Sequence, residues 1–271
     1  MSTCEYPLSP QRTEWLKKRR RRHVMITSAK VGILLFIIFF WEFAARAGLI
    51  DPFITSSPSR VMDTLVGLSL SGELWRHLAA TVMEAAAGFI LGTVFGTLVA
   101  IALWCSDFLC QVLEPYLVIL NALPKIALGP VFIVWLGAGK TAIIVITLSV
   151  SIVVAILEVL GGFLSTDKEK IRLAETFGAN KFEVLRRVVL PSNVPTILGS
   201  LKINVGMSWV GVIVGEFLVS REGLGYLIVY GSQVFQLDLV MASVVVLAVV
   251  AALMYLSIQW VEKKLSQRRG G

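Results

Sequence analysis

The sequence predicts an all-α polytopic membrane protein with about six transmembrane helices. Two observations predict this class. Hydrophobic residues make up 56% of the 271 residues and charged residues only 16%, whereas soluble domains have roughly 45–50% and about 25%. The mean hydropathy is +0.79, and the apolar residues fall into runs long enough to cross a bilayer.

The net charge of +7 could indicate nucleic-acid binding. In so apolar a chain, however, basic residues more often mark the loops that remain in the cytoplasm. We therefore expect contact with membrane lipid and no nucleic-acid partner.

Residues 1–30 form a basic tail that contains Arg19–Arg22. The apolar run that follows, from Val31 to about Ala47, is longer than the core of a secretory signal, so it should remain as a membrane anchor. The mixed stretch from Gly48 to His77 is too polar for a span, and we expect it on the outer side, as a helix at the membrane surface or against its neighbours.

The second predicted span, about Ala79–Trp104, carries small residues at every fourth position: Gly88, Gly92, Gly96 and Ala100. Such a stripe lets another helix approach closely. The third, roughly Gln111–Leu136, is interrupted by prolines, and repeated breaks imply that the freed carbonyls face protein or water.

Gly139-Lys140-Thr141 resembles the end of a phosphate-binding loop, but Val134 stands where that loop requires glycine. We interpret the segment as a tight turn before the fourth span, Ala142 to about Phe163. The fifth span covers about Thr196–Val219 and the last Leu239–Trp260. The expected domains are thus a basic tail (1–30), a transmembrane domain (31–261) and a second basic tail (262–271).

The Lys and Arg residues set the expected orientation. Residues 1–30, 164–200 and 261–271 hold 18 of the 25. By the positive-inside rule, both termini and the 165–195 segment should be cytoplasmic.

Cys4, Cys105 and Cys110 form no CxxC pair, and His23 and His77 lie far apart. We expect free thiols, isolated surface histidines and neither a metal site nor a catalytic site.

Ser165–Pro195, called here the charged loop, contains two short amphipathic pieces separated by Gly178-Ala179-Asn180. Ile171, Ala174 and Phe177 or Gly178 share one face, and Phe182, Leu185 and Val189 share another. The loop could lie on the membrane surface, or a soluble protein could grip its exposed face.

The charged loop carries a resemblance. Gly178, nine further residues and Val188-Val189-Leu190-Pro191 are similar to the motif of permease subunits of ATP-binding-cassette importers. The chain departs from this motif at Arg172, Leu173 and Ala174, where the family has Glu, Ala and Ala; Glu175 lies one turn along. Residues 122–130, 135–137 and 223–228 resemble the nitrate/sulfonate/taurine branch, which also includes permeases for pyrimidine-like vitamin precursors.

This resemblance implies a type I importer permease in the bacterial cytoplasmic membrane. It also implies separate ATPase subunits inside, a solute-binding protein outside and a second copy of the chain, with no cofactor of its own. The residues that it places at the ATPase are Arg172, Leu173, Ala174, Glu175, Phe177, Gly178, Ala179, Asn180, Phe182, Arg186 and Arg187.

Polar residues within spans usually face a wet interior or bond a neighbouring helix. The candidates for the translocation path are Asn121, Lys125, Asn204, Ser208 and Glu216. Two other classes stay open, an ion-coupled secondary transporter and a membrane scaffold that transports nothing.

Overall fold

The structure, a computed structural model, describes residues 10–267, and these residues contain no β-strand. Cys4, Arg268 and Arg269 lie outside the described residues, as does the side chain of His23. The all-α class is confirmed. The elements are α1 (Pro10–Arg46), α2 (Pro52–Thr55), α3 (Pro58–Leu70), α4 (Glu73–Cys105), α5 (Asp107–Ala122), the 3₁₀ turn η1 (Lys125–Leu128), α6 (Gly129–Leu136), α7 (Lys140–Leu164), α8 (Lys168–Thr176), α9 (Lys181–Val184), the π-helix η2 (Leu185–Val189), α10 (Leu190–Ser192), α11 (Val194–Val219), α12 (Leu224–Gln233) and α13 (Leu237–Gln267).

Among residues 10–267, five helices are long and apolar enough to cross a membrane, within α1, α4, α7, α11 and α13. The pair formed by α5 and residues 125–136 makes a sixth if it counts as one span. The two halves of this pair meet at 85°, beside Pro124. The predicted break in the third span is therefore real, and it turns the chain sharply.

The chain divides into two compact units, residues 1–63 and residues 64–271. In the first, the helix of the apolar run extends back through the basic residues to Pro10, so α1 is one helix of 37 residues. Glu42 ties the end of α1 to the start of α3, because its carboxylate pairs with Arg46 at 2.5 Å and accepts from the Ser59 amide at 3.0 Å.

The second unit is built around α7, which packs between α4 and α11. The stripe on α4 faces α7 as predicted: a Cβ added at Gly88, Gly92 or Gly96 would collide with Thr147, Ser151 or Ala155. The hydroxyls of Thr147 and Ser151 bond back to carbonyls of their own helix at 2.8 and 3.0 Å. The polar groups at this contact are therefore satisfied without a partner on α4.

Helix α11 approaches the other side of α7 in the same way. A Cβ on Gly211 would lie 2.6 Å from the Thr147 Cα, and one on Gly215 would lie 2.9 Å from the Ile143 Cγ2. Thr147 is thus held between glycines of two helices. The backbones of α4, α7 and α11 approach so closely there that a side chain larger than the hydrogen of glycine would not fit on α4 or α11.

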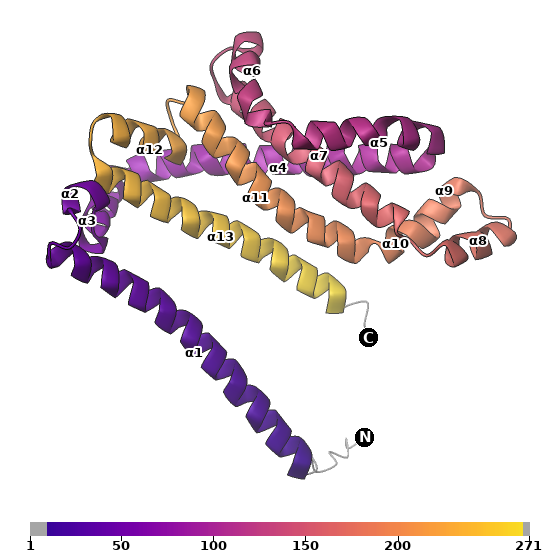
Figure 1. Cartoon of the computed structure of the whole chain (residues 1–271), viewed down its shortest axis with the longest axis horizontal. Coiled ribbons are helices and arrows are strands. Elements are labelled where there is room, and N and C mark those ends of the chain that lie inside the picture. The colour runs from indigo at the N-terminus through magenta and orange to yellow at the C-terminus, as the bar shows by residue number, and fades with distance from the viewer. Residues whose placement is uncertain (1–9, 268–271) are drawn as a thin grey trace. The chain divides into compact units, whose positions relative to one another are not determined.

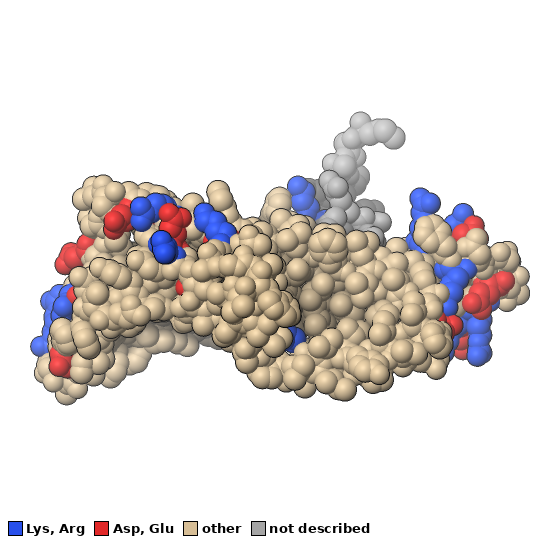
Figure 2. All heavy atoms as spheres, turned by 90° about the horizontal axis from the view of Figure 1, so that it is seen from above, with Lys and Arg blue, Asp and Glu red and all other residues tan. Residues whose placement is uncertain are grey.

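The two ends of the second unit differ. Helices α8, α9 and α10 lie at one end and α12 at the other (Figure 1). Acidic and basic side chains gather over α8 and α9, at the right of Figure 2, while the broad middle of the surface is almost uncharged. This distribution suits an apolar bundle with polar ends.

Candidate functional site

The charged loop folds as two helices joined at a left-handed glycine. Asp167 caps α8 by accepting from the Glu169 amide at 2.9 Å. The helix ends at Gly178, whose φ of +85° is a conformation that favours glycine. Asn180 and Glu183 then form a capping box that starts α9. The two amphipathic pieces and the break between them are confirmed.

One face of the charged loop is buried against the ends of α4, α5 and α7. Val184, Leu185 and Val189 are at most 2% exposed and belong to the same apolar cluster as Trp104 and Phe163. Ile171, Ala174 and Ala179 pack against the edge of this cluster. Hydrophobic burial therefore attaches the loop firmly to the bundle.

Polar contacts reinforce this attachment at two points. Lys181 pairs with Asp107 at the start of α5, with Nζ and Oδ2 3.0 Å apart. At the base of the loop, the buried Asn193 amide donates to the Thr166 hydroxyl at 2.6 Å and to the Val189 carbonyl at 2.9 Å. The bond from Asn193 to Thr166 joins the segments that enter and leave the loop.

The opposite face carries bare apolar side chains. Phe177 is 84% exposed, Phe182 65% and Leu173 59%. Helical spacing alone groups Phe177 and Phe182 with the apolar residues of their helices, but neither side chain lies on the buried face. Large exposed apolar side chains rimmed by charges are typical of a protein interface.

The structure brings the predicted docking residues together on this one loop. Two of them, Ala174 and Ala179, are partly buried. The exposed members are Arg172, Leu173, Glu175, Phe177, Gly178, Asn180, Phe182, Arg186 and Arg187. Arg187 lies 3.8 Å from Glu183, one turn away on the same face.

The candidate path residues fall into two groups. Lys125 lies at the sharp bend after α5, and its ammonium group donates to both the backbone carbonyl and the side-chain oxygen of Asn121 at 3.3 Å. A lysine thus satisfies a carbonyl near the point where the helix breaks. Among the described residues, no hydrogen bond joins this pair to the second group.

Asn204, Ser208 and Glu216 form the second group, on one side of α11, and all three are at most 1% exposed. The Asn204 amide makes a long contact, 3.5 Å, with the Thr93 hydroxyl on α4. Asn204 Oδ1, Ser208 Oγ and Glu216 Oε1 accept no hydrogen bond. This side of α11 therefore has buried oxygen atoms that accept no hydrogen bond within the bundle.

A third polar group was missed by the sequence analysis. His77, expected at the surface, is 2% exposed, and Thr81 is fully buried. The Gly223 amide donates to His77 Nδ1 at 2.9 Å, and the Leu224 amide donates to the Thr81 hydroxyl at 2.7 Å. The signal was the spacing of polar residues on α4, but their partner lies more than 140 positions away.

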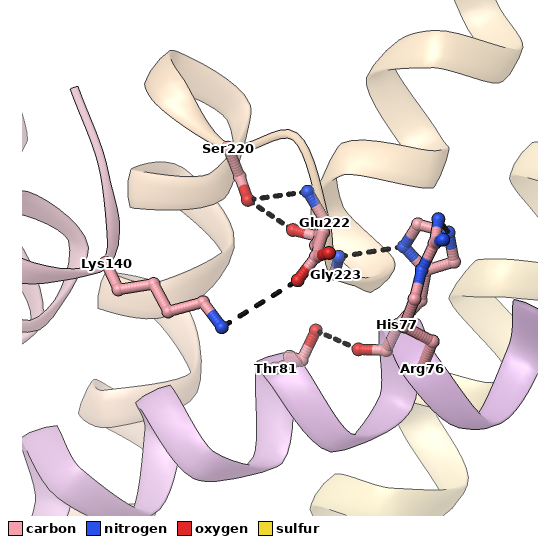
Figure 3. A network of polar contacts seen from close by, with 7 residues as sticks. All are labelled: Arg76, His77, Thr81, Lys140, Ser220, Glu222 and Gly223. Atoms are coloured by element: carbon pink, nitrogen blue, oxygen red, sulfur yellow. Dashed lines mark hydrogen bonds and ion pairs between the residues drawn. The ribbon is translucent and has the colours of Figure 1, made fainter.

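Figure 3 shows this group from close by, with Gly223 pointing at His77. Ser220 bonds both the amide and the carbonyl of Glu222, which tightens the turn between α11 and α12. Lys140, at the start of α7, reaches the Glu222 carboxylate at 3.7 Å. Helices α4, α7, α11 and α12 are thus joined at this end of the unit.

An apolar bundle with a broken span, buried polar side chains and an exposed apolar loop at one end is typical of a subunit embedded in a membrane. Residues 92–270 match the family described as binding-protein-dependent transport system inner membrane component. The chain belongs to this family.

Curated relatives agree with the family. A probable ABC transporter permease protein of Haemophilus influenzae is 33% identical over 230 residues, which cover 85% of this chain and 92% of the relative. The taurine transport system permease protein of Escherichia coli is 28% identical, with 89% of each chain covered. A putative aliphatic sulfonates transport permease protein of Bacillus subtilis is 29% identical, with 88% and 87% covered.

Solved structures share the fold at low identity. A bacterial alginate ABC transporter, in complex with an alginate pentasaccharide-bound periplasmic protein, matches with a TM-score of 0.61 and 17% identity, covering 92% of this chain and 97% of its own. An inward-facing methionine ABC transporter matches with a TM-score of 0.56 and 19% identity, covering 72% and 95%. The predicted importer permease fold is confirmed.

Proposed function

We propose that this chain imports a small sulfonate-like anion as the permease subunit of an ATP-driven importer, and that the charged loop is the part that a separate ATPase grips. One observation carries this proposal. Leu173, Phe177 and Phe182 are bare on one face of a loop whose other face is anchored in the bundle. Movement of an ATPase bound to this loop therefore moves the helices beneath it.

The mechanism follows from this anchoring. ATP binding closes two ATPase subunits and draws together the charged loops that they hold. Because Val184, Leu185 and Val189 are packed against α4, α5 and α7, the displacement passes into these helices. Closely packed elements shift as units, so the bundle changes between inward-open and outward-open forms.

The partners divide the remaining tasks. The ATPase subunits hydrolyse ATP, a solute-binding protein delivers the solute from outside, and a second copy of this chain completes the pore. This chain itself does no bond chemistry. Support for these partners comes from the family, whose members depend on a binding protein.

The orientation in this proposal places the charged loop and both termini in the cytoplasm. Residues 1–30, 164–200 and 261–271 hold 18 of the 25 Lys and Arg residues, which supports this side. The α12 end, with Glu73, Arg76 and the Lys140–Glu222 pair, then faces outward.

The path in this proposal includes Asn121 and Lys125 at the broken span, and Asn204 and Ser208 on α11. The Lys125 charge favours an anion, which agrees with a sulfonate. Glu216 bonds the start of α12, so we assign it to that contact instead. The main alternative keeps the same architecture but imports a pyrimidine-like vitamin precursor, which needs no cation in the path.

Reconstitution tests the proposal. The chain is placed in vesicles with the ATPase subunit and binding protein encoded beside it, and uptake of labelled taurine is measured with and without ATP. We expect uptake that requires all three proteins and ATP. Uptake that persists without the ATPase would instead indicate an ion-coupled secondary transporter.

A further inference from the structure

Three side chains of α4 form a buried polar stripe toward the start of α12. His77, Thr81 and Glu84 lie at positions i, i+4 and i+7 of the helix, so they share one face. Their exposed fractions are 2%, 0% and 3%. His77 and Thr81 accept hydrogen bonds from the Gly223 and Leu224 amides, whereas Glu84 Oε2 accepts none.

The next amide in the chain leads to Glu216. The Gly225 amide donates to Glu216 Oε2 at 2.6 Å, so three successive amides are satisfied by side chains of α4 and α11. The first amides of a helix have no partner within it. A carboxylate at this position is also favoured by the helix dipole.

Glycines make room for the Glu216 carboxyl group. A Cβ on Gly225 would lie 2.8 Å from Glu216 Oε2, and one on Gly223 would collide with the carboxyl atoms themselves. Gly223 also has a φ of +113°, which side chains rarely adopt. The turn into α12 is therefore shaped around this one carboxyl group.

Glu84 approaches Glu216 from α4, close enough for the two carboxyl groups to interact. Glu84 Oε2 and Glu216 Oε1 receive no hydrogen bond from any N–H group or hydroxyl. Two ionised carboxylates in contact would repel strongly in so dry a place, whereas one proton between them forms a strong hydrogen bond.

Within the described part of the chain, no cation near the two carboxyl groups is placed to neutralise them in the absence of this proton. Lys140 lies 3.7 Å from the Glu222 carboxylate, and these two side chains are 67% and 41% exposed. His77 uses Nδ1 to accept from Gly223, and Arg76 lies at the far nitrogen of the same ring, 3.4 Å away. The Thr81 hydroxyl accepts from the Leu224 amide and donates to the His77 carbonyl at 3.2 Å.

We propose that Glu84 and Glu216 hold one proton between them, with Glu84 as the acid that donates to Glu216, and that this pair positions α12 against α4 and α11. Both are positioning residues. Glu84 supplies the hydrogen-bond donor, and Glu216 supplies the negative charge that caps α12. The proton assignment is independent of the proposed function, which enters only through the uptake measurements.

Infrared difference spectroscopy of the purified full chain in lipid nanodiscs tests the proton directly. At neutral pH an ordinary glutamate is ionised, since its pKa is about 4.3. We expect the C=O stretch of a protonated carboxyl group in the wild-type chain and its loss in Glu84→Gln. The matched control is Glu158→Gln, on the exposed side of α7, which should leave the band in place.

Uptake separates the two roles. Glu84→Gln keeps a neutral donor of the same shape, so uptake should stay within about threefold of wild type. Glu84→Ala and Glu216→Gln remove the donor or the charge, and each should lower uptake by at least about tenfold.

Two results would overturn the proposal: a wild-type spectrum without a protonated carboxyl band, or a Glu84→Gln variant as inactive as Glu84→Ala. Failure of the proposed function looks different, because the wild-type complex would then show no ATP-dependent uptake while the infrared band remains. If a variant does not fold, the absence of the band from the wild-type spectrum still overturns the proposal.

Discussion

Phe177 exposes 84% of its surface at the tip of the charged loop and is therefore the residue on which the docking proposal can be tested with least disturbance. Truncating it removes no internal contact, so Phe177→Ala should change the free energy of unfolding by less than about 0.5 kcal/mol. A central aromatic anchor at an interface contributes about 2 kcal/mol or more. We expect the Kd for the ATPase subunit, titrated in nanodiscs, to rise about 30-fold.

The control for this variant is Phe39→Ala. Phe39 is 69% exposed within the candidate span of α1, so it offers a similar side chain to lipid. Phe39→Ala should leave the Kd for the ATPase subunit unchanged. Equal effects of the two variants would show that Phe177 has no special part in binding.

Lys125 gives a second prediction at the residue scale. Lys125→Met removes the only charge at the bend in the third span while keeping a long side chain. If the solute is an anion that passes this point, uptake of labelled taurine should fall at least about tenfold, because a counter-charge in a low-dielectric path is strongly favourable.

Lys125→Arg is the matched variant, since it keeps the charge and can still donate to the Asn121 carbonyl. Its uptake should lie between those of wild type and Lys125→Met. Unchanged uptake in Lys125→Met, with ATPase binding intact, would remove Lys125 from the path.

At the scale of elements, stability depends on how closely α11 approaches α7. Gly211→Ala would place a Cβ 2.6 Å from the Thr147 backbone, which cannot move aside. Overpacking of this kind costs about 1–3 kcal/mol. We expect a lower Tm for Gly211→Ala in detergent.

Gly206 supplies the comparison on the same helix. A Cβ there meets nothing within 4 Å. Gly206→Ala should raise stability by about 0.5–1 kcal/mol, because alanine is the better helix former. A Tm that moves the same way in both variants would contradict the proposed close contact.

Much of the fold could be predicted because its signals are local. The apolar runs predicted the spans, and Gly178 predicted the break in the charged loop. The four-residue spacing from Gly88 predicted a close helix contact, but not that α7 makes it. Each of these patterns depends on residues within a few turns of one another. Hydropathy and helical periodicity are therefore sufficient to detect them.

The remaining features depend on partners distant in the sequence. His77 is buried because the amide of Gly223 reaches it, and no pattern around His77 contains that information. Helical spacing alone groups Phe177 and Phe182 with the apolar residues of their helices, whereas the resemblance places them at the ATPase. Both are exposed, because the core beneath the loop is filled by Val184, Leu185 and Val189. The π-helix before Pro191 is a further case, where a missing amide lets the helix widen.

For the whole molecule, the proposed orientation makes a direct prediction. In a chain whose three native cysteines are replaced by serine, Thr176→Cys should react with a membrane-impermeant maleimide only after the cells are opened. Ser71→Cys, exposed in the turn before α4, should react in intact cells. The reverse pattern would mean that the charged loop lies outside.

The central claim is that a soluble ATPase binds the bare face of the charged loop, and photocrosslinking tests it most directly. A photoreactive phenylalanine analogue replaces Phe177 in the assembled complex, and the same analogue replaces Phe39 as a control. We expect a protein crosslink from position 177 to the ATPase subunit and only lipid adducts from position 39. Lipid adducts alone at position 177 would contradict it and would indicate a loop that lies on the membrane surface.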